Sequence, residues 1–240
     1  MYCGDFSLAS VGFNDMTQSD KSNMNRLVFT YWGALFLLAC QANAPTESRV
    51  ANLPYYNDPT FTAHWFAPDS DSLEGFHQIP DFELVNQEGD TITEESFADK
   101  IYVADFFFTT CPGICPKMTK NMVLLQEAFL QEEDVMLLSH SVTPSIDSVT
   151  ALKMYAEYQG VESNKWFLTT GDRDLIYRLG RTAYFVEEDL GIEKDLDEFL
   201  HTENFVLIDK NRRIRGIYNG LNKTAIAQLI TDIKTLQKEG

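Results

Sequence analysis

The segment Ile101–Met122 reads IYVADFFFTTCPGICPKMTKNM, and this stretch decides the fold. An apolar run from Ile101 to Phe108 is followed closely by Cys111 and Cys115, each with a proline behind it. Beyond the second proline the apolar residues adopt helical spacing. The stretch therefore predicts a buried strand that delivers two thiols to the N-terminus of a helix. That position is known for lowering thiol pKa values and for binding soft metals.

The remainder of the chain alternates strand patterns with helix patterns. The predicted elements, in order, are a hairpin over 82–93, a strand over 101–108, a helix over 116–131, a strand over 135–142, a helix over 148–158 with Asp147 as its N-cap, a strand over 166–169, a helix over 173–182, an irregular acidic insertion over 183–200, a hairpin over 205–218 and a helix over 226–236. Such alternation implies a sheet with helices on both faces. With the dithiol directly after the first central strand, the pattern describes an α/β, thioredoxin-like fold.

Composition and charge exclude several functions. The chain has 240 residues, of which 44% are hydrophobic, so it can build a substantial core. Its formal charge of −17 makes nucleic acids and anionic membrane surfaces poor partners. Four cysteines are too few for a disulfide scaffold in a chain of this length.

The N-terminal segment has the features of an export signal. Basic residues at Lys21 and Arg26 precede an apolar run over 27–39 that ends at Cys40. The run is too short to cross a bilayer, which takes about 20 residues, but it suits a signal peptide. The segment resembles a bacterial lipoprotein signal, which implies that Cys40 is lipidated and becomes the first residue of the mature chain. An uncleaved membrane anchor is the alternative, and both place the body of the protein outside the cytoplasm.

These observations predict three parts of the chain. Residues 1–39 form a lipoprotein-type signal peptide. Residues 40–78 form a tether and an extended arm rich in aromatic residues. Residues 79–240 form the thioredoxin-like domain.

The pair Cys111 and Cys115 admits several uses. A structural disulfide would add little stability here, because the loop that it closes is short. A zinc site would need a second pair of cysteines or histidines nearby. A functional dithiol remains, either redox-active or metal-binding.

Thioredoxin relatives place a cis-proline before a late strand opposite the dithiol, but the last proline of this chain is Pro144. Just before the late strand predicted at 205, this chain has His201 in place of a proline. Two thiolates with one imidazole suit Cu(I), or Cu(II) with an added ligand.

Other candidate ligands have simpler explanations. Met118 and Met122 lie on the apolar stripe of the predicted helix, so core packing is favoured over thioether ligation. His140 lies near the end of a strand and is expected to be structural rather than an alternative ligand or a group behind the ligands. His64 and His77 are expected to serve surface or packing roles.

Four blocks of the chain together resemble the Sco/SenC family of copper-binding proteins that assemble cytochrome c oxidase. The blocks are FFFTTCPGICP at 106–116, SVTP at 141–144 with Asp147, the segment 166–171, and His201-Thr202 ahead of 205–209. The resemblance implies that Cys111, Cys115 and His201 are the copper ligands. The chain departs from the family pattern at Leu200 and Thr143, where acidic residues are common.

The resemblance predicts a copper metallochaperone for the dinuclear copper centre of cytochrome c oxidase. Its partners would be the copper-site subunit of the oxidase and a thiol reductant or upstream copper donor. The protein would belong to the cell envelope, anchored to a membrane and facing the periplasm. The alternative function is an extracytoplasmic thiol–disulfide oxidoreductase in which Cys111 attacks a substrate disulfide and Cys115 resolves the mixed disulfide.

Overall fold

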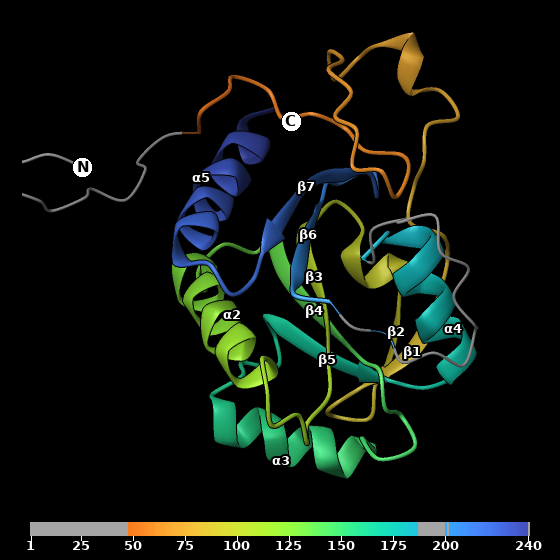
Figure 1. The fold of residues 1–240 in the computed structure, drawn as a ribbon, viewed down its shortest axis with the longest axis vertical. Helices are drawn as coiled ribbons and strands as arrows, with labels where there is room; N and C mark the ends of the chain where they lie inside the picture. The colour runs from red at the N-terminus through yellow and green to blue at the C-terminus, as the bar shows by residue number, and fades with distance from the viewer. Residues whose placement is uncertain (1–47, 187–199, 201, 240) are drawn as a thin grey trace, which may run out of the picture. The chain divides into compact units, whose positions relative to one another are not determined.

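A seven-stranded mixed sheet forms the centre of the described part of the chain, which comprises residues 48–186, 200 and 202–239. The protein is represented by a computed structural model (Figure 1). The strand order is β2-β1-β5-β4-β3-β6-β7. The strands are β1 (Glu83–Asn86), β2 (Thr91–Thr93), β3 (Ile101–Phe107), β4 (Val135–Ser141), β5 (Trp166–Thr170), β6 (Asn204–Ile208) and β7 (Ile214–Asn219).

The parallel strands lie in the middle of the sheet and the antiparallel strands lie toward its edges. Strand β4 pairs in parallel with β3 and with β5, while β6 runs antiparallel to β3 and β1 runs antiparallel to β5. Parallel neighbours need a crossover connection, and the helices after β3 and β4 supply it. In this register Phe106 lies opposite His140.

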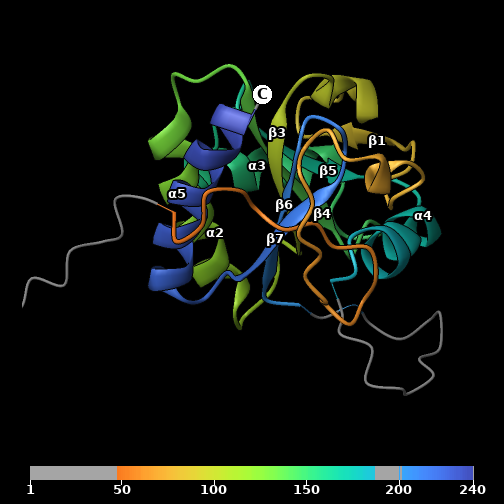
Figure 2. The same ribbon diagram turned by 90° about the horizontal axis from the view of Figure 1, so that it is seen from above.

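Helices cover both faces of the sheet (Figures 1 and 2). The helical elements are α2 (Cys115–Phe129), α3 (Val149–Gln159), α4 (Arg173–Arg178) and α5 (Lys223–Glu239), with short turns η2 (Asp71–Leu73), η3 (Glu94–Phe97) and η4 (Leu179–Ala183). Helices α2, α3 and α5 pack on one face, and α4 with η4 packs on the other. None of the helices in the described part of the chain has the length and apolar character needed to cross a bilayer.

Strand β3 feeds both cores because alternate side chains point to opposite faces. Val103 and Phe107 join the core under α2, whereas Ala104 and Phe106 join the core under α4. Every residue of β3 is buried, as its continuous apolar pattern predicts. The dithiol therefore follows a strand that is held on both sides.

The predicted order of strands and helices is confirmed, with two local corrections. The helix predicted over 173–182 is α-helical only to Arg178 and then continues as the π-helical turn η4. Asp147 is not the N-cap of α3. Ser148 caps this helix by accepting a hydrogen bond of 3.3 Å from the backbone N–H of Ala151. The carboxylate of Asp147 instead points toward the dithiol loop.

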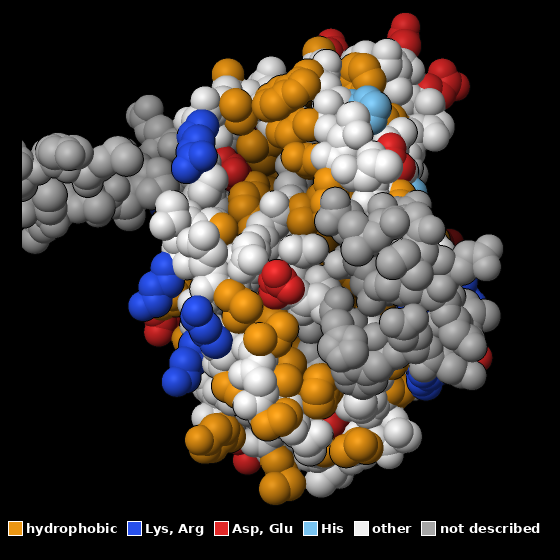
Figure 3. Space-filling model, viewed as in Figure 1, with side chains coloured by type: hydrophobic (Ala, Val, Ile, Leu, Met, Phe, Trp, Pro, Cys, Tyr) orange, Lys and Arg blue, Asp and Glu red, His pale blue; other side chains and the backbone are white. Residues whose placement is uncertain are grey.

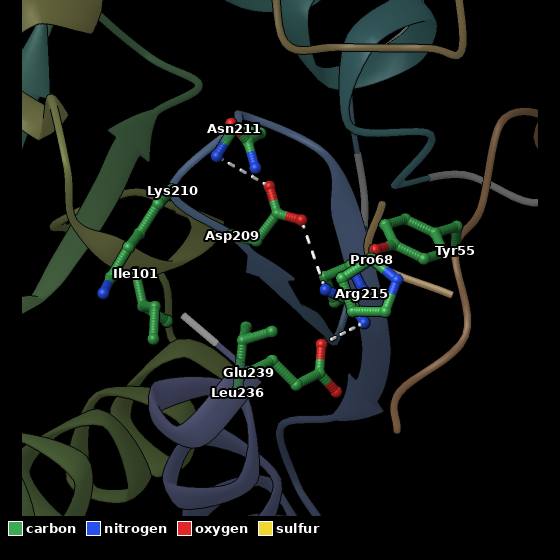
Figure 4. Close-up of a pocket in the computed structure, with 9 residues that line it drawn as sticks. All are labelled: Tyr55, Pro68, Ile101, Asp209, Lys210, Asn211, Arg215, Leu236 and Glu239. Atoms are coloured by element: carbon green, nitrogen blue, oxygen red, sulfur yellow. Dashed lines mark hydrogen bonds and ion pairs between the residues drawn. The ribbon is translucent and has the colours of Figure 1, made fainter. Parts of the chain in front are cut away.

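The arm before the domain is fastened by one buried arginine. The guanidinium of Arg215 donates to the carbonyl oxygens of Leu53 and Pro54 at 2.8 and 3.1 Å. It also pairs with the carboxylates of Asp209 and Glu239 at 3.3 and 2.6 Å (Figure 4). Its side chain is 3% exposed. A short arm segment thus joins strand β7, the end of β6 and helix α5.

We expect Arg215→Met to lower the free energy of unfolding by about 3–5 kcal/mol, because two buried carboxylates lose their counter-charge. Chemical denaturation measures this change. The matched control is Arg212→Met, since Arg212 pairs with Asp81 at 2.6 Å but on an exposed surface. The control should lose less than about 1 kcal/mol. Equal losses of unfolding free energy in the two variants would contradict the role of Arg215 in holding the arm to the domain.

Candidate metal centre

The two thiols of the dithiol occupy different environments. Cys111 lies in the loop after β3 and is partly exposed, whereas Cys115 is the first residue of α2 and is 5% exposed. Pro116 fits the first turn of this helix because the N–H groups there have no partner within the helix. The strand end and the helix start therefore hold one thiol toward solvent and the other in the core.

This difference separates the acidities of the two thiols. Burial raises the pKa of Cys111, but hydrogen bonds from the Cys115 thiol and from the backbone N–H groups of Cys115, Gly113 and Ile114 outweigh it and bring the pKa below its ordinary value. Burial raises the pKa of Cys115, and its hydrogen bond to Cys111 raises it further. Cys111 is therefore the thiol that ionises first and the one that a partner meets first.

A buried carboxylate fixes the loop that carries Cys111. Asp147 is fully buried and accepts hydrogen bonds from the backbone N–H of Thr109 at 3.2 Å and from its hydroxyl at 2.5 Å. It also accepts from the hydroxyls of Ser141 at 2.6 Å and Thr143 at 3.0 Å. The loop after β3 and the loop after β4 are therefore held together. The closeness of Asp147 to the Ser-Val-Thr-Pro block was the sequence signal for this role in joining the loops. The prediction of Asp147 as a helix N-cap accounted for the residue in another way.

A second buried carboxyl lies beneath the helix that begins at Cys115. Asp105 belongs to the face of β3 that α2 covers, between Val103 and Phe107, and it is 2% exposed. The hydroxyl of Ser139 donates to it, and the indole N–H of Trp166 donates to that hydroxyl at 2.8 Å. Burial raises the pKa of Asp105 to about 7. Sequence reasoning missed this residue, although a lone acidic residue inside an apolar strand was the available signal.

The predicted third ligand, His201, lies outside the described residues, as does Cys40. Its neighbours Leu200 and Thr202 are both buried. Strand β6 begins at Asn204 and runs antiparallel to β3, so its start shares a sheet edge with the end of β3. Within the described residues no three His, Cys, Asp or Glu side chains gather into a metal-binding group.

Four of the other candidate ligands lie in packed or hydrogen-bonded positions. Met118 and Met122 are buried in the core under α2. The ring of His140 is fully buried on the opposite face, beside Phe106, and lies 3.0 Å from the hydroxyl of Thr169 through Nδ1. His77 reaches the carbonyl oxygen of Ala183 at 2.7 Å through Nε2.

Comparison with known proteins gives a consistent result. The SCO1/SenC family model matches residues 70–238. A SCO1/SenC family lipoprotein from Bacillus anthracis str. Ames is 30% identical, with a TM-score of 0.59 over 67% of this chain and 95% of that one. BsSco, a member of the Sco family of cytochrome c oxidase assembly proteins in which a disulfide switch was identified, is 29% identical, with a TM-score of 0.57 over 68% and 94%.

A more distant structure agrees in fold. ScoI of Bradyrhizobium japonicum, solved with copper bound, is 24% identical, with a TM-score of 0.52 over 65% of this chain and 98% of that one. These neighbours are thioredoxin-like, so the predicted α/β, thioredoxin-like fold is confirmed.

The buried carboxyl on β3 predicts a pH-dependent stability. The pKa of Asp105 is raised from 3.8 to about 7 in the folded chain. Below pH 3.8 the carboxyl is protonated in both the folded and the unfolded chain, so its burial costs no ionisation free energy there. The penalty grows as pH rises from 3.8 to 7 and is complete above it. Asp105→Asn should therefore raise the free energy of unfolding at pH 8 by roughly 2–4 kcal/mol, and the gain should vanish near pH 4.

Denaturant titrations at several pH values measure this gain. Asp69→Asn is the control, because Asp69 is exposed and its variant should follow the wild-type profile at every pH. A gain for Asp105→Asn that does not depend on pH would contradict the assignment.

Proposed function

The chain belongs to the SCO1/SenC family, and from that premise we propose that it is a copper metallochaperone for cytochrome c oxidase. The Sco family is associated with cytochrome c oxidase assembly and with copper binding. In our proposal copper is cargo, held by Cys111, Cys115 and His201 and passed to the dinuclear copper centre of the oxidase.

One observation carries the proposal: two thiols lie at the start of one helix, one partly exposed with a lowered pKa and the other buried. Soft thiolate ligands select Cu(I), and an imidazole completes a three-coordinate set. Because Cys111 is the accessible thiol, an incoming cysteine of the acceptor would displace it first. Cys115, held in the core, would keep the metal until the second acceptor ligand arrives. The metal then passes by ligand exchange and is never free in solution.

The same asymmetry supports a second function, thiol–disulfide exchange. The Cys111 thiolate would attack a disulfide of the acceptor, forming a mixed disulfide and releasing one acceptor thiolate. The Cys115 thiol would then lose its proton to solvent and attack the Cys111 sulfur, releasing the second acceptor thiolate. The acceptor gains two electrons, and the chain is left with a Cys111–Cys115 disulfide that a thiol reductant must reduce. The low pKa of Cys111 favours this function.

Removing the imidazole separates the two functions. Because His201 would supply one of three ligands, His201→Ala should weaken copper binding to the reduced protein at least about tenfold. Its disulfide reductase activity should be unchanged. Copper titration with spectroscopic detection measures the first, and reduction of a disulfide peptide measures the second.

His77→Gln is the matched control, because the His77 ring is already hydrogen-bonded to the carbonyl oxygen of Ala183 and its loss should leave copper binding intact. A wild-type protein that binds no copper but reduces disulfides would reject the metallochaperone in favour of the oxidoreductase.

We propose that the chain is a lipoprotein of the cell envelope, with its body facing the periplasm. The support is the apolar run before Cys40 and the likeness to a family lipoprotein. Mass spectrometry of the membrane-extracted protein should then find an N-terminal Cys40 carrying two or three acyl chains. Cys40→Ser should abolish the acylation. An N-terminus at Met1 or Met24 would instead indicate the uncleaved anchor.

A further inference from the structure

We propose that a basic groove at the end of α5 rests on the anionic lipid surface to which the chain is tethered. This α5 groove has a volume of about 700 Å³ and lies between residues 48–52 of the arm, Pro68 and the last turns of α5. Its partner is a bilayer surface rich in acidic phospholipid headgroups. The inference rests on the proposed anchoring through the segment that ends at Cys40. It goes beyond that anchoring, because an anchor alone does not fix which face of the domain meets the lipid.

Three exposed cations line the α5 groove. Arg49 comes from the arm, and Lys234 and Lys238 lie one turn apart on α5. None of the three belongs to an ion pair among the residues that the structure describes. Figure 3 shows Lys and Arg side chains spaced along the left side of the molecule, where α5 and α2 lie in the view of Figure 1.

The acidic residues of α5 do not cancel this charge, because both are buried and have partners. Asp232 accepts hydrogen bonds from the hydroxyls of Ser48 at 2.5 Å and Tyr218 at 2.8 Å. Glu239 pairs with the buried guanidinium of Arg215 at 2.6 Å. The groove therefore presents positive charge to solvent in a chain whose formal charge is −17.

Acidic residues border the α5 groove and confine the contact to it. On one side Asp69, which is exposed, follows Pro68. On the other side the amide of Gln237 donates to the carboxylates of Glu132 and Asp134 at 2.5 and 3.0 Å. An anionic surface is repelled by these borders and by the net charge of the chain. Because charges act within about 8 Å at physiological salt, the groove itself still attracts such a surface.

The start of the arm brings the tether to this groove. The hydrogen bond from Ser48 to Asp232 holds the arm against α5, and Figure 1 shows the start of the arm beside the end of that helix. Eight residues lead from Cys40 to Ser48, so they span at most about 29 Å even when fully extended. A groove kept this close to the lipid meets it at a high effective concentration, so a few weak attractions suffice for contact.

This contact would set the direction in which the dithiol faces. Asn121, in the half of α2 that begins with Cys115, donates to the carbonyl oxygen of Gly220 at 2.6 Å, just before α5 begins. The dithiol therefore lies toward the start of α5, whereas the groove lies at its end, about 25 Å along the helix axis. Docking through the groove holds Cys111 away from the lipid and open to a protein in the aqueous phase.

The test compares lysine reactivity in the full chain reconstituted into two kinds of vesicle. One contains phosphatidylcholine alone, and the other contains equal parts of phosphatidylcholine and phosphatidylglycerol. A water-soluble acetylating reagent modifies exposed amines, and mass spectrometry measures the rate at each site. Lys234 and Lys238 should react at least about threefold more slowly in the anionic vesicles, because the docked form then outnumbers the free form by about two to one. Salt at about 1 M should remove this protection.

Lys117 and Lys120 serve as an internal control, because they are exposed on the first turns of α2. Both should react at the same rate in the two kinds of vesicle.

The double variant Lys234→Glu/Lys238→Glu gives a second readout at Arg49, which phenylglyoxal modifies. In the wild type Arg49 should be protected by the anionic vesicles, and in the variant it should react equally fast in both kinds. The matched control Lys117→Glu/Lys120→Glu carries the same change in charge and should keep the protection of Arg49.

Equal reaction rates of Lys234 and Lys238 in the two kinds of vesicle would overturn the inference. Equal protection of Lys117 and Lys120 would overturn it in favour of general adsorption or of contact between copies.

The mass of the N-terminus, measured on the same samples, keeps this result separate from the proposed lipidation. Protection of the groove in a chain that begins at Met1 or Met24 rejects acylation but supports the docking face, because an uncleaved anchor leads into the same eight residues. An acylated Cys40 without protection of the groove leaves the lipoprotein standing and rejects the docking face.

Discussion

The structure depends on an abrupt change in burial at the end of β3. Seven consecutive buried residues lead to a short loop, and within that loop the chain passes from core to surface and back to core. Cys111 lies at the surface and Cys115 lies where the chain re-enters the core. Desolvation opposes ionisation of the buried thiol, while hydrogen-bond donors at the helix start stabilise the thiolate of the accessible one. The chemical difference between the thiols follows from this geometry.

Buried carboxyl groups hold this arrangement from two sides, at a cost in desolvation. Asp147 satisfies donors from two loops, so its charge is compensated by hydrogen bonds rather than by a cation. Burial raises the pKa of Asp105, and the one hydroxyl that donates to it, from Ser139, offsets only part of that effect. A protein selected for stability alone would place apolar residues at the site of Asp105. Its position beneath the dithiol fits a domain whose core serves a reactive site as well as the fold.

Charge is distributed unevenly over the chain, and this matters for the proposed partner. The acidic residues keep away from the segments that carry the dithiol, while the arm and the last helix are joined by Arg215 between two carboxylates. In the first turns of α2 the exposed charges are Lys117 and Lys120, and at physiological salt a contact surface responds to charges within about 8 Å.

The amino-acid sequence by itself determined the order of strands and helices and the presence of a dithiol at a strand–helix junction. These follow from local patterns: the continuous apolar run of β3, the prolines beside the cysteines and the helical spacing after them. Only the tertiary structure decided the role of Asp147, because a cap and a clamp between loops look alike in sequence. It also decided that His140 and the dithiol lie on opposite faces and that Asp105 lies under α2. These facts depend on strand register and on which helix covers which face, and both are set by contacts between residues far apart in the chain.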